Sequence, residues 1–226
     1  MVRVYNINSR KRNVLSGFSM NSILIFINVV FFIVALIFGF FKSPCSLTIC
    51  EYIALSPANI LAGKYLWTFL TSMFMHGNFF HLFANMISLM FVGSFVQKIL
   101  GAKRYLYFYL ISGLFAGLLF VLSGLVFSTD LNTYAVGASG ALFGLIGVLM
   151  LLTPNQPVYL MFIPIPIKMK YAAPGMLIVL WLISIAGNVP IGNMTHLGGL
   201  ISGLVYGVYL KKKFKKKTKY INKYFS

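Results

Sequence analysis

The sequence predicts an all-α polytopic membrane protein in which six transmembrane helices form one bundle. Its 226 residues are 59% hydrophobic and 9% charged, whereas a soluble domain has roughly a quarter of its residues charged. A soluble core of this size has no room for so many apolar side chains. The 19 Lys and Arg residues also lie at the chain ends and in short breaks between apolar runs, not in one basic patch.

The six apolar segments must be helical in lipid, because an unpaired backbone amide is too costly there. They span residues 23–41, 79–96, 105–127, 138–152, 172–186 and 196–210. The fourth and sixth are short, and about 15 residues cover only about 22 Å of a layer about 30 Å thick. Since Thr153-Pro154 and a Lys-rich tail anchor their inner ends, we expect their outer ends to begin below the membrane surface. Such helix starts need water, so the sequence predicts a wet depression that opens outward.

The charges orient the bundle. With six spans, 17 of the cations and no acid fall on one side, and the other side has Lys42, Lys64, Glu51 and Asp130. The positive-inside rule then puts both termini in the cytoplasm. We therefore expect a basic N-terminal segment at 1–20, a six-helix domain at 21–210 and a Lys-rich tail at 211–226. The first span is too long for a signal peptide.

The same pattern predicts location and partners. We expect an integral membrane protein, and a compact six-span chain without an appended domain suits a prokaryotic plasma membrane. The tail is typical of a stop-transfer anchor that also touches anionic lipid, which we prefer to nucleic-acid binding. The partners expected are the lipid bilayer and no nucleic acid.

The scarcity of acids limits the chemistry. The only side-chain carboxylates are Glu51 and Asp130, and the only imidazoles are His76, His81 and His196. No HExxH zinc site can form, a paired-aspartate protease lacks its second Asp, and a carboxylate relay for transport has almost nothing to work with. We expect neither a metal nor a cofactor, so the chemistry must use hydroxyls, amides, imidazoles and backbone.

A serine and a histidine stand where the two short segments begin, Ser139 in Gly-Ala-Ser-Gly and His196 in Thr-His-Leu-Gly-Gly. Both segments carry glycines at helical spacing, which lets helix backbones approach closely: Gly140, Gly144 and Gly147 in one, Gly199, Gly203 and Gly207 in the other. A helix start favours a developing negative charge, and an imidazole supplies the base that a hydroxyl lacks. Phe143, four residues after Ser139, is placed to pack on that imidazole. Singly, each residue is more simply a packing serine and a hydrogen-bonded histidine; together they favour catalysis.

The second segment adds His81 and Asn85 on one helical face. Neutral donors of this kind stabilise an oxyanion, and each typically contributes about 2 to 4 kcal/mol. The alternative for Asn85 is an interhelical hydrogen bond that holds the bundle together. His76 precedes the helix, and we expect it to brace the outer loop and not to act in catalysis.

These motifs resemble those of the rhomboid family of intramembrane serine proteases, along nearly the whole chain. The matching residues are His81-Leu82-Phe83-Ala84-Asn85, Gly137-Ala138-Ser139-Gly140, and His196 with Gly198, Gly199 and Gly203. The resemblance implies a six-helix core, a Ser139–His196 dyad, and an oxyanion hole formed by His81, Asn85 and the Ser139 amide. It also implies transmembrane protein substrates that enter near segment five, under the loop at 187–193.

Two positions depart from the family pattern. Gln97 stands where many members have Glu, and Thr68 follows Trp67 where many have Arg. Both features are considered structural in the family, so the departures concern loop packing and stability more than chemistry.

The predicted function is a serine endopeptidase that cleaves transmembrane segments through an acyl-enzyme. Without a carboxylate as third member, since Asp130 lies in the outer loop, we expect slow turnover. A noncatalytic rhomboid-like protein that binds transmembrane helices is the alternative, and a small channel or transporter is a third class.

Two cysteines, Cys45 and Cys50, lie in the first outer loop. Two free thiols are the expectation, and a bridge stays open if that face is oxidising.

Overall fold

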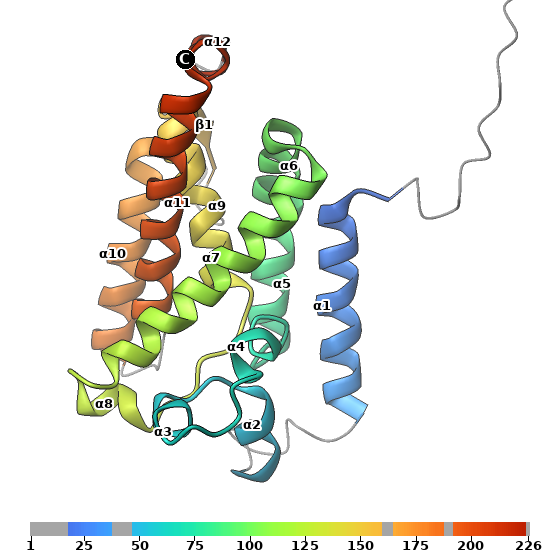
Figure 1. Cartoon of the computed structure of the whole chain (residues 1–226), viewed down its shortest axis with the longest axis vertical. Coiled ribbons are helices and arrows are strands. Elements are labelled where there is room, and N and C mark those ends of the chain that lie inside the picture. The colour runs from blue at the N-terminus through green and yellow to red at the C-terminus, as the bar shows by residue number, and fades with distance from the viewer. Residues whose placement is uncertain (1–17, 38–46, 160–164, 188–191, 225–226) are drawn as a thin grey trace, which may run out of the picture.

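A computed structural model of the chain describes residues 18–37, 47–159, 165–187 and 192–224, and nearly all of its regular structure is helical (Figure 1). The elements are α1 (Met20–Ile37), α2 (Leu47–Ile53), α3 (Pro57–Leu61), α4 (Thr68–Thr71), α5 (Phe79–Ser88), η2 (Leu89–Gly93), α6 (Ser94–Leu100), α7 (Ala102–Ser123), α8 (Ser128–Leu131), α9 (Ser139–Leu152), β1 (Pro157–Val158), β2 (Ile167–Lys168), α10 (Met169–Gly187), α11 (Asn193–Lys213) and α12 (Lys215–Tyr224). The two short strands pair antiparallel, with Pro157 opposite Lys168.

Helix forms over each of the six apolar segments: α1, the continuous run α5–η2–α6, α7, α9, α10 and α11. Four of these are long and apolar enough to cross a membrane, at Met20–Ile37, Phe79–Leu100, Ala102–Ser123 and Met169–Gly187. The α9 helix is short, as predicted, at 14 residues. The predicted shortness of the last segment is wrong, because α11 has 21 residues. It begins three residues earlier, at Asn193, and continues through three lysines that extend past the apolar stretch.

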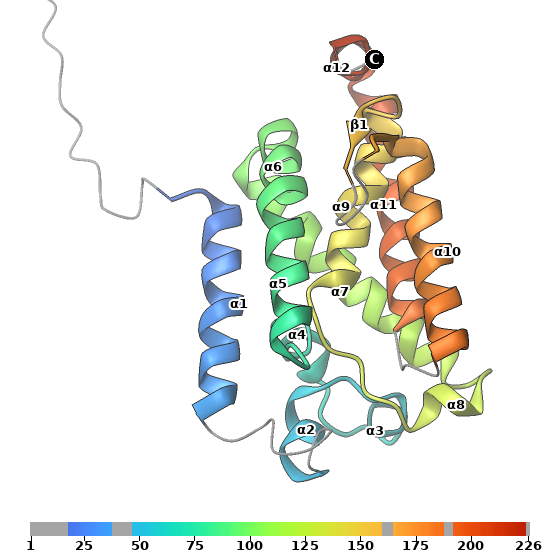
Figure 2. The same ribbon diagram turned by 180° about the vertical axis from the view of Figure 1, so that it is seen from behind.

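The α9 helix is the centre of the bundle. Every residue from 140 to 149 is buried, since α11, α7 and α10 pack around it and α5, η2 and α6 complete the ring. A helix that is hydrophobic on all sides is expected to be enclosed in this way. The chain between α8 and α9 runs up along the bundle, so α9 begins well inside it (Figure 2).

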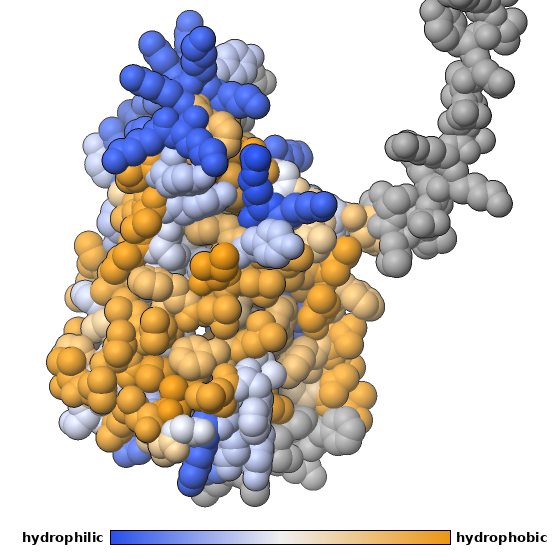
Figure 3. Space-filling model, in the orientation of Figure 1, coloured by the Kyte–Doolittle hydropathy of each residue, from blue (hydrophilic) through white to orange (hydrophobic). Residues whose placement is uncertain are grey.

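The surface is apolar around the helices and cationic at one end (Figure 3). That end carries the α6–α7 junction with Lys98, Lys103 and Arg104, the β2–α10 junction, and α12 (Figure 1). The opposite end holds α2, α3, α4 and α8 (Figure 1). The cations that the sequence assigns to one side are therefore together in the described part of the fold.

Helix α2 at the opposite end contains a buried cysteine, Cys50, which is disulfide-bonded. The expectation of two free thiols is therefore wrong, and Cys45 lies outside the described residues.

Candidate active site

Glycines bring α9 and α11 into backbone contact. A Cβ added to Gly203 would collide with the Gly144 carbonyl, and one on Gly199 would collide with the Gly140 carbonyl. In the other direction, a Cβ on Gly147 would lie 2.7 Å from the Leu200 carbonyl oxygen. Such close approach is available only to small residues. The glycine stripes read from the sequence do face each other, and they fix the distance between the two helix starts.

Ser139 and His196 meet at the ends of these helices. Ser139 is the first residue of α9, and its Oγ lies 2.8 Å from Nε2 of His196. His196 is in the first turn of α11, where its backbone N–H donates to the Gly192 carbonyl at 3.1 Å. The imidazole is only 7% exposed, whereas Ser139 is partly exposed. A hydroxyl with an adjacent imidazole is the arrangement that nucleophilic catalysis by serine requires.

The imidazole of His196 is oriented by an aromatic ring and not by an acid. The Phe143 ring stacks on it with centroids 4.7 Å apart and 26° between the planes. Its second nitrogen, Nδ1, has no hydrogen-bond partner among the described residues. Asp130 accepts instead from the Ser123 hydroxyl at 2.7 Å. In the part of the chain that the structure describes, the dyad therefore has no carboxylate as third member.

The segment that leads into α9 is held by backbone hydrogen bonds to residues next to α3 and α4. Ala135 and Leu55 exchange both backbone hydrogen bonds, at 2.8 and 3.1 Å, and the N–H of Gly137 donates to Ser72 at 2.8 Å. Gly137 has a φ of +113°, a conformation in which a side chain would be strained. No specific role for this motif glycine was predicted from the sequence; in the structure it turns the chain into α9 just before the serine.

His81 borders the same space from α5. A Cβ added to Gly137 would lie 2.8 Å from Cε1 and Nε2 of His81 and 3.8 Å from the Ser139 Oγ. The histidine is fixed at its backbone, where its N–H donates to the Asn78 side chain, the N-cap of the helix, at 2.8 Å. The structure thus brings His81, Ser139 and His196 to one place.

Asn85 is buried close to this group but is bonded within its own helix. Its Nδ2 donates to the His81 carbonyl at 2.8 Å, and its Oδ1 has no partner among the described residues. Asparagine has a second amide hydrogen, which this bond leaves for another acceptor. The structure does not show a hydrogen bond between Asn85 and Ser139.

The ring of His76 packs against the ring of His81. The two rings meet edge to face with centroids 5.1 Å apart, and His76 is fully buried. Burial lowers the pKa of His76 to about 3, with the neighbouring His81 as a second cause and the Phe74 backbone as a weaker opposing one. This contact with His81 does not test the bracing of the outer loop that the sequence predicts, so that role stays a prediction. Among the described residues, no group of three His, Cys, Asp or Glu side chains could hold a metal ion.

Comparison with known proteins gives a family for this arrangement. The family model described as Rhomboid domain matches residues 63–213. RHOMBOID-like protein 1 of Arabidopsis thaliana is 38% identical over 73% of this chain and 39% of its own length. Rhomboid protein 1, mitochondrial, of Saccharomyces cerevisiae is 30% identical over 62% of this chain and 41% of its own. Inactive RHOMBOID-like protein 8 of Arabidopsis thaliana is 32% identical over 61% of this chain and 36% of its own length.

The chain spans about half or less of the length of these relatives. They come from a plant and a yeast, so they do not support the expected prokaryotic source. The matched domain and the long apolar helices make the chain an integral membrane protein.

Proposed function

Because this chain belongs to the rhomboid family, we propose that it is an intramembrane serine endopeptidase that cleaves transmembrane segments of other membrane proteins. The observation that carries the proposal is the 2.8 Å contact between the Ser139 hydroxyl and the His196 imidazole. A relative of similar identity is named inactive, so family membership alone does not decide activity. The residues at the site must decide it.

In the proposed reaction, Ser139 Oγ attacks the carbonyl carbon of the scissile peptide while His196 Nε2 takes the hydroxyl proton. The imidazolium then gives this proton to the leaving amine, which leaves an ester between Ser139 and the substrate's acyl part. Water, deprotonated by the same imidazole, hydrolyses the ester. Stacking by Phe143 keeps the ring aligned for both transfers, in place of an acid.

The negative oxygen formed in this reaction needs donors. The Ser139 backbone N–H is in the first turn of α9, where helix amides have no intrahelical partner. The His81 ring borders the same space, and Asn85 has its second amide hydrogen to offer. We assign these three groups to the oxyanion hole, each expected to contribute about 2 to 4 kcal/mol.

For the membrane, we propose six crossings, made by α1, α5–η2–α6, α7, α9, α10 and α11 within a domain at 21–210. The cationic end then faces the cytoplasm with both termini, and the start of α9 opens toward the other side. Because α9 is short and begins inside the bundle, its first amides would need water there. A cleft that admits water would serve hydrolysis as well.

The test is incubation of purified protein with a labelled single-span membrane substrate. Wild type is expected to cleave it, and Ser139→Ala and His196→Ala are each expected to lower the rate by about a thousandfold or more. Ser88→Ala is the matched control, because within the described ranges the Ser88 hydroxyl bonds only to the Ala84 carbonyl of its own helix. Equal cleavage by all four proteins would refute the proposal. Binding without cleavage by wild type would favour a noncatalytic protein that binds transmembrane helices.

A further inference from the structure

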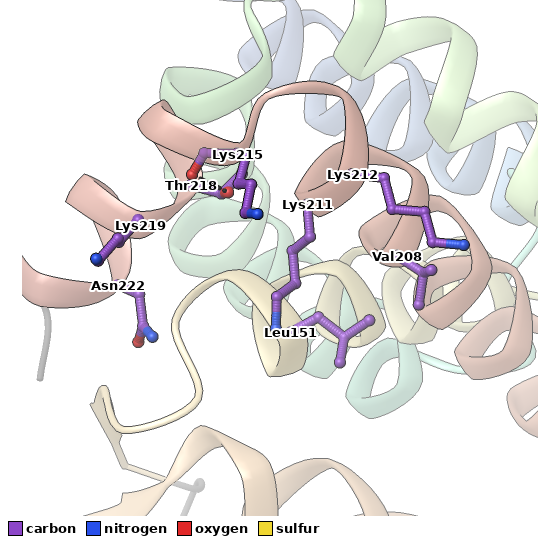
Figure 4. A pocket seen from close by; sticks show the side chains of 8 residues that line it. All are labelled: Leu151, Val208, Lys211, Lys212, Lys215, Thr218, Lys219 and Asn222. Carbon is purple, nitrogen blue, oxygen red and sulfur yellow. Dashed lines mark hydrogen bonds between the residues drawn. The ribbon is translucent and has the colours of Figure 1, made fainter.

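A hollow of about 660 Å³ lies where α9, α11 and α12 meet at the cationic end (Figure 4). Its lining combines four lysines with two aliphatic and two neutral polar side chains: Leu151, Val208, Lys211, Lys212, Lys215, Thr218, Lys219 and Asn222. Lys211 reaches from α11 toward Leu151, and Lys215 and Lys219 come from α12 (Figure 4). The hollow is far from Ser139, at the other end of α9.

Among the described residues, the elements that form this hollow carry no acidic side chain. Residues 211–226 contain eight lysines and no acid, and the chain's two acids, Glu51 and Asp130, belong to α2 and α8 at the opposite end (Figure 1). Three of the lysines, 215–217, also occupy the first turn of α12. Cations there oppose the positive end of the helix dipole, so a bound anion would relieve both sources of repulsion.

The hollow is fixed in shape by packing and is not part of a loose tail. Phe214, between α11 and α12, packs against the core, and the Arg104 guanidinium lies 5.5 Å over its ring. On α12, Thr218 is buried and its hydroxyl donates to the Phe214 and Lys215 carbonyls at 3.2 Å. The α12 helix is thereby held crosswise at the end of α11, as both views show (Figures 1 and 2).

The lining also suits a ligand that is apolar on one side. Leu151 belongs to α9 and Val208 to α11, and Val208 is 44% exposed. We propose that this hollow binds the headgroup of an anionic phospholipid from the surrounding leaflet. The four lysines surround the phosphate, and the lipid's first apolar carbons lie against Leu151 and Val208. This binding does not depend on the proposed protease activity.

The experiment measures lipid binding to the delipidated full-length protein in neutral detergent, by native mass spectrometry. Phosphatidylglycerol is titrated beside phosphatidylcholine, and inorganic pyrophosphate serves as a soluble phosphate. The site variant is Lys215→Gln/Lys219→Gln. The matched control is Lys216→Gln/Lys217→Gln, which removes the same charge from the same helix but outside the hollow. Lys215→Arg/Lys219→Arg keeps the charge, and the melting temperature of each variant checks its fold.

We expect one phosphatidylglycerol to bind more tightly than the other two probes, and the site variant to weaken its binding by about tenfold or more, because two of the four lysines that line the hollow are lost. The control and the Arg variant should stay within about threefold of wild type. Equal weakening by site and control variants would overturn the proposal, because only diffuse charge would then act. Equal binding of phosphatidylcholine, or pyrophosphate binding as tight as that of the lipid, would overturn it too.

Discussion

The α9–α11 contact and the attachment of α1 join helices by opposite means. Between α9 and α11 the backbones touch through glycines, such as Gly203 against the Gly144 carbonyl. At α1, one buried side chain, Asn21, forms several hydrogen bonds. It donates to the Leu89 carbonyl at 2.7 Å and to Ser94 at 3.1 Å, accepts from the Tyr105 hydroxyl at 2.5 Å, and its backbone N–H donates to Gln97 at 2.6 Å.

The difference follows from the solvent. In lipid there is no hydrophobic driving force between helices, so close packing or hydrogen bonds must hold them together. Glycine contacts set a short, rigid spacing, which suits a site whose two groups must stay at hydrogen-bond distance. Hydrogen bonds from Asn21 tie α1 to the run α5–η2–α6 and to α7. Gly93 leaves the space that the asparagine occupies, because a Cβ there would collide with Asn21 Oδ1. Chemistry is thus proposed at the glycine contact, and the polar contact supplies attachment.

The largest effect is expected from breaking the glycine contact. In Gly203→Ala the new methyl group would meet the Gly144 carbonyl, so we expect a loss of about 2 to 3 kcal/mol in the free energy of unfolding. Displacing His196 from Ser139 should lower the cleavage rate by about a hundredfold. Thermal unfolding in detergent and the cleavage assay measure both.

Gly175→Ala on α10 is the control, because a Cβ there meets nothing within 4 Å. Alanine in place of glycine at an open helical position is expected to raise the free energy of unfolding by about 0.5 to 1 kcal/mol. If the two variants behave alike, the glycine contact does not set the spacing.

His76 is a buried polar side chain that, unlike Asn21, has no hydrogen-bond partner for its ring among the described residues. Its pKa is lowered from 6.5 to about 3, so the unfolded chain binds the proton more readily than the folded one. The contribution of neutral His76 to the free energy of unfolding is therefore fully present above pH 6.5, and it is lost as the pH falls toward 3. Between pH 7 and 5 we expect wild type to lose about 2 kcal/mol more than His76→Gln.

Unfolding free energies of both proteins at the two pH values test this. His196 is common to both proteins, and because His81 contacts His76, the difference reports His76 together with its effect on His81. Parallel pH profiles would mean that the folded protein accepts a proton on His76 without cost.

A smaller effect is expected at the polar contact. Asn21→Ala leaves the Tyr105 hydroxyl without its partner and removes one of the two donors to the Leu89 carbonyl, which should cost about 1 to 2 kcal/mol of unfolding free energy. Cleavage in the folded fraction should stay near wild type, because Ser139 and His196 are not involved. A hundredfold loss of activity would show that attachment of α1 also sets the site.

The smallest change in unfolding free energy is expected for Gln97→Glu. Gln97 accepts through Oε1 from the Asn21 N–H, and a carboxylate in its place accepts equally well, so the expected change is within about 0.5 kcal/mol. The departure from the family's Glu is thus accommodated at the start of α1. A large change in unfolding free energy in either direction would contradict this reading.

Much of the fold and the candidate site was predictable because its signals are local. Apolar runs gave the six helical segments, and glycines at helical spacing gave the faces of α9 and α11 that meet. Ser139 and His196 stood out because each follows a break and opens such a helix. The length of α11 was not predictable from apolarity, since Lys211–Lys213 continue a helix that hydropathy alone would end.

Contacts between distant residues could not be predicted. The bonds from Asn21 join positions 68 to 84 residues apart, and no periodicity marks them; the only signal was a polar residue near an apolar run. The pairing of Leu55 with Ala135, which holds the start of α9, likewise depends on loops meeting in space. Helix α12 was not predicted, because the many lysines of the tail favour an exposed segment. Its less exposed residues Thr218, Ile221 and Asn222 do recur at helical spacing.

The central claim is that Ser139 is a nucleophile activated by His196. Intact-mass measurement after treatment with a serine-reactive fluorophosphonate tests it without any choice of substrate. We expect one adduct on wild type, mapped to Ser139 by peptide sequencing, none on Ser139→Ala, and labelling slowed by about a hundredfold or more on His196→Ala. An adduct that forms equally fast on His196→Ala, or that maps to another serine, would contradict the account.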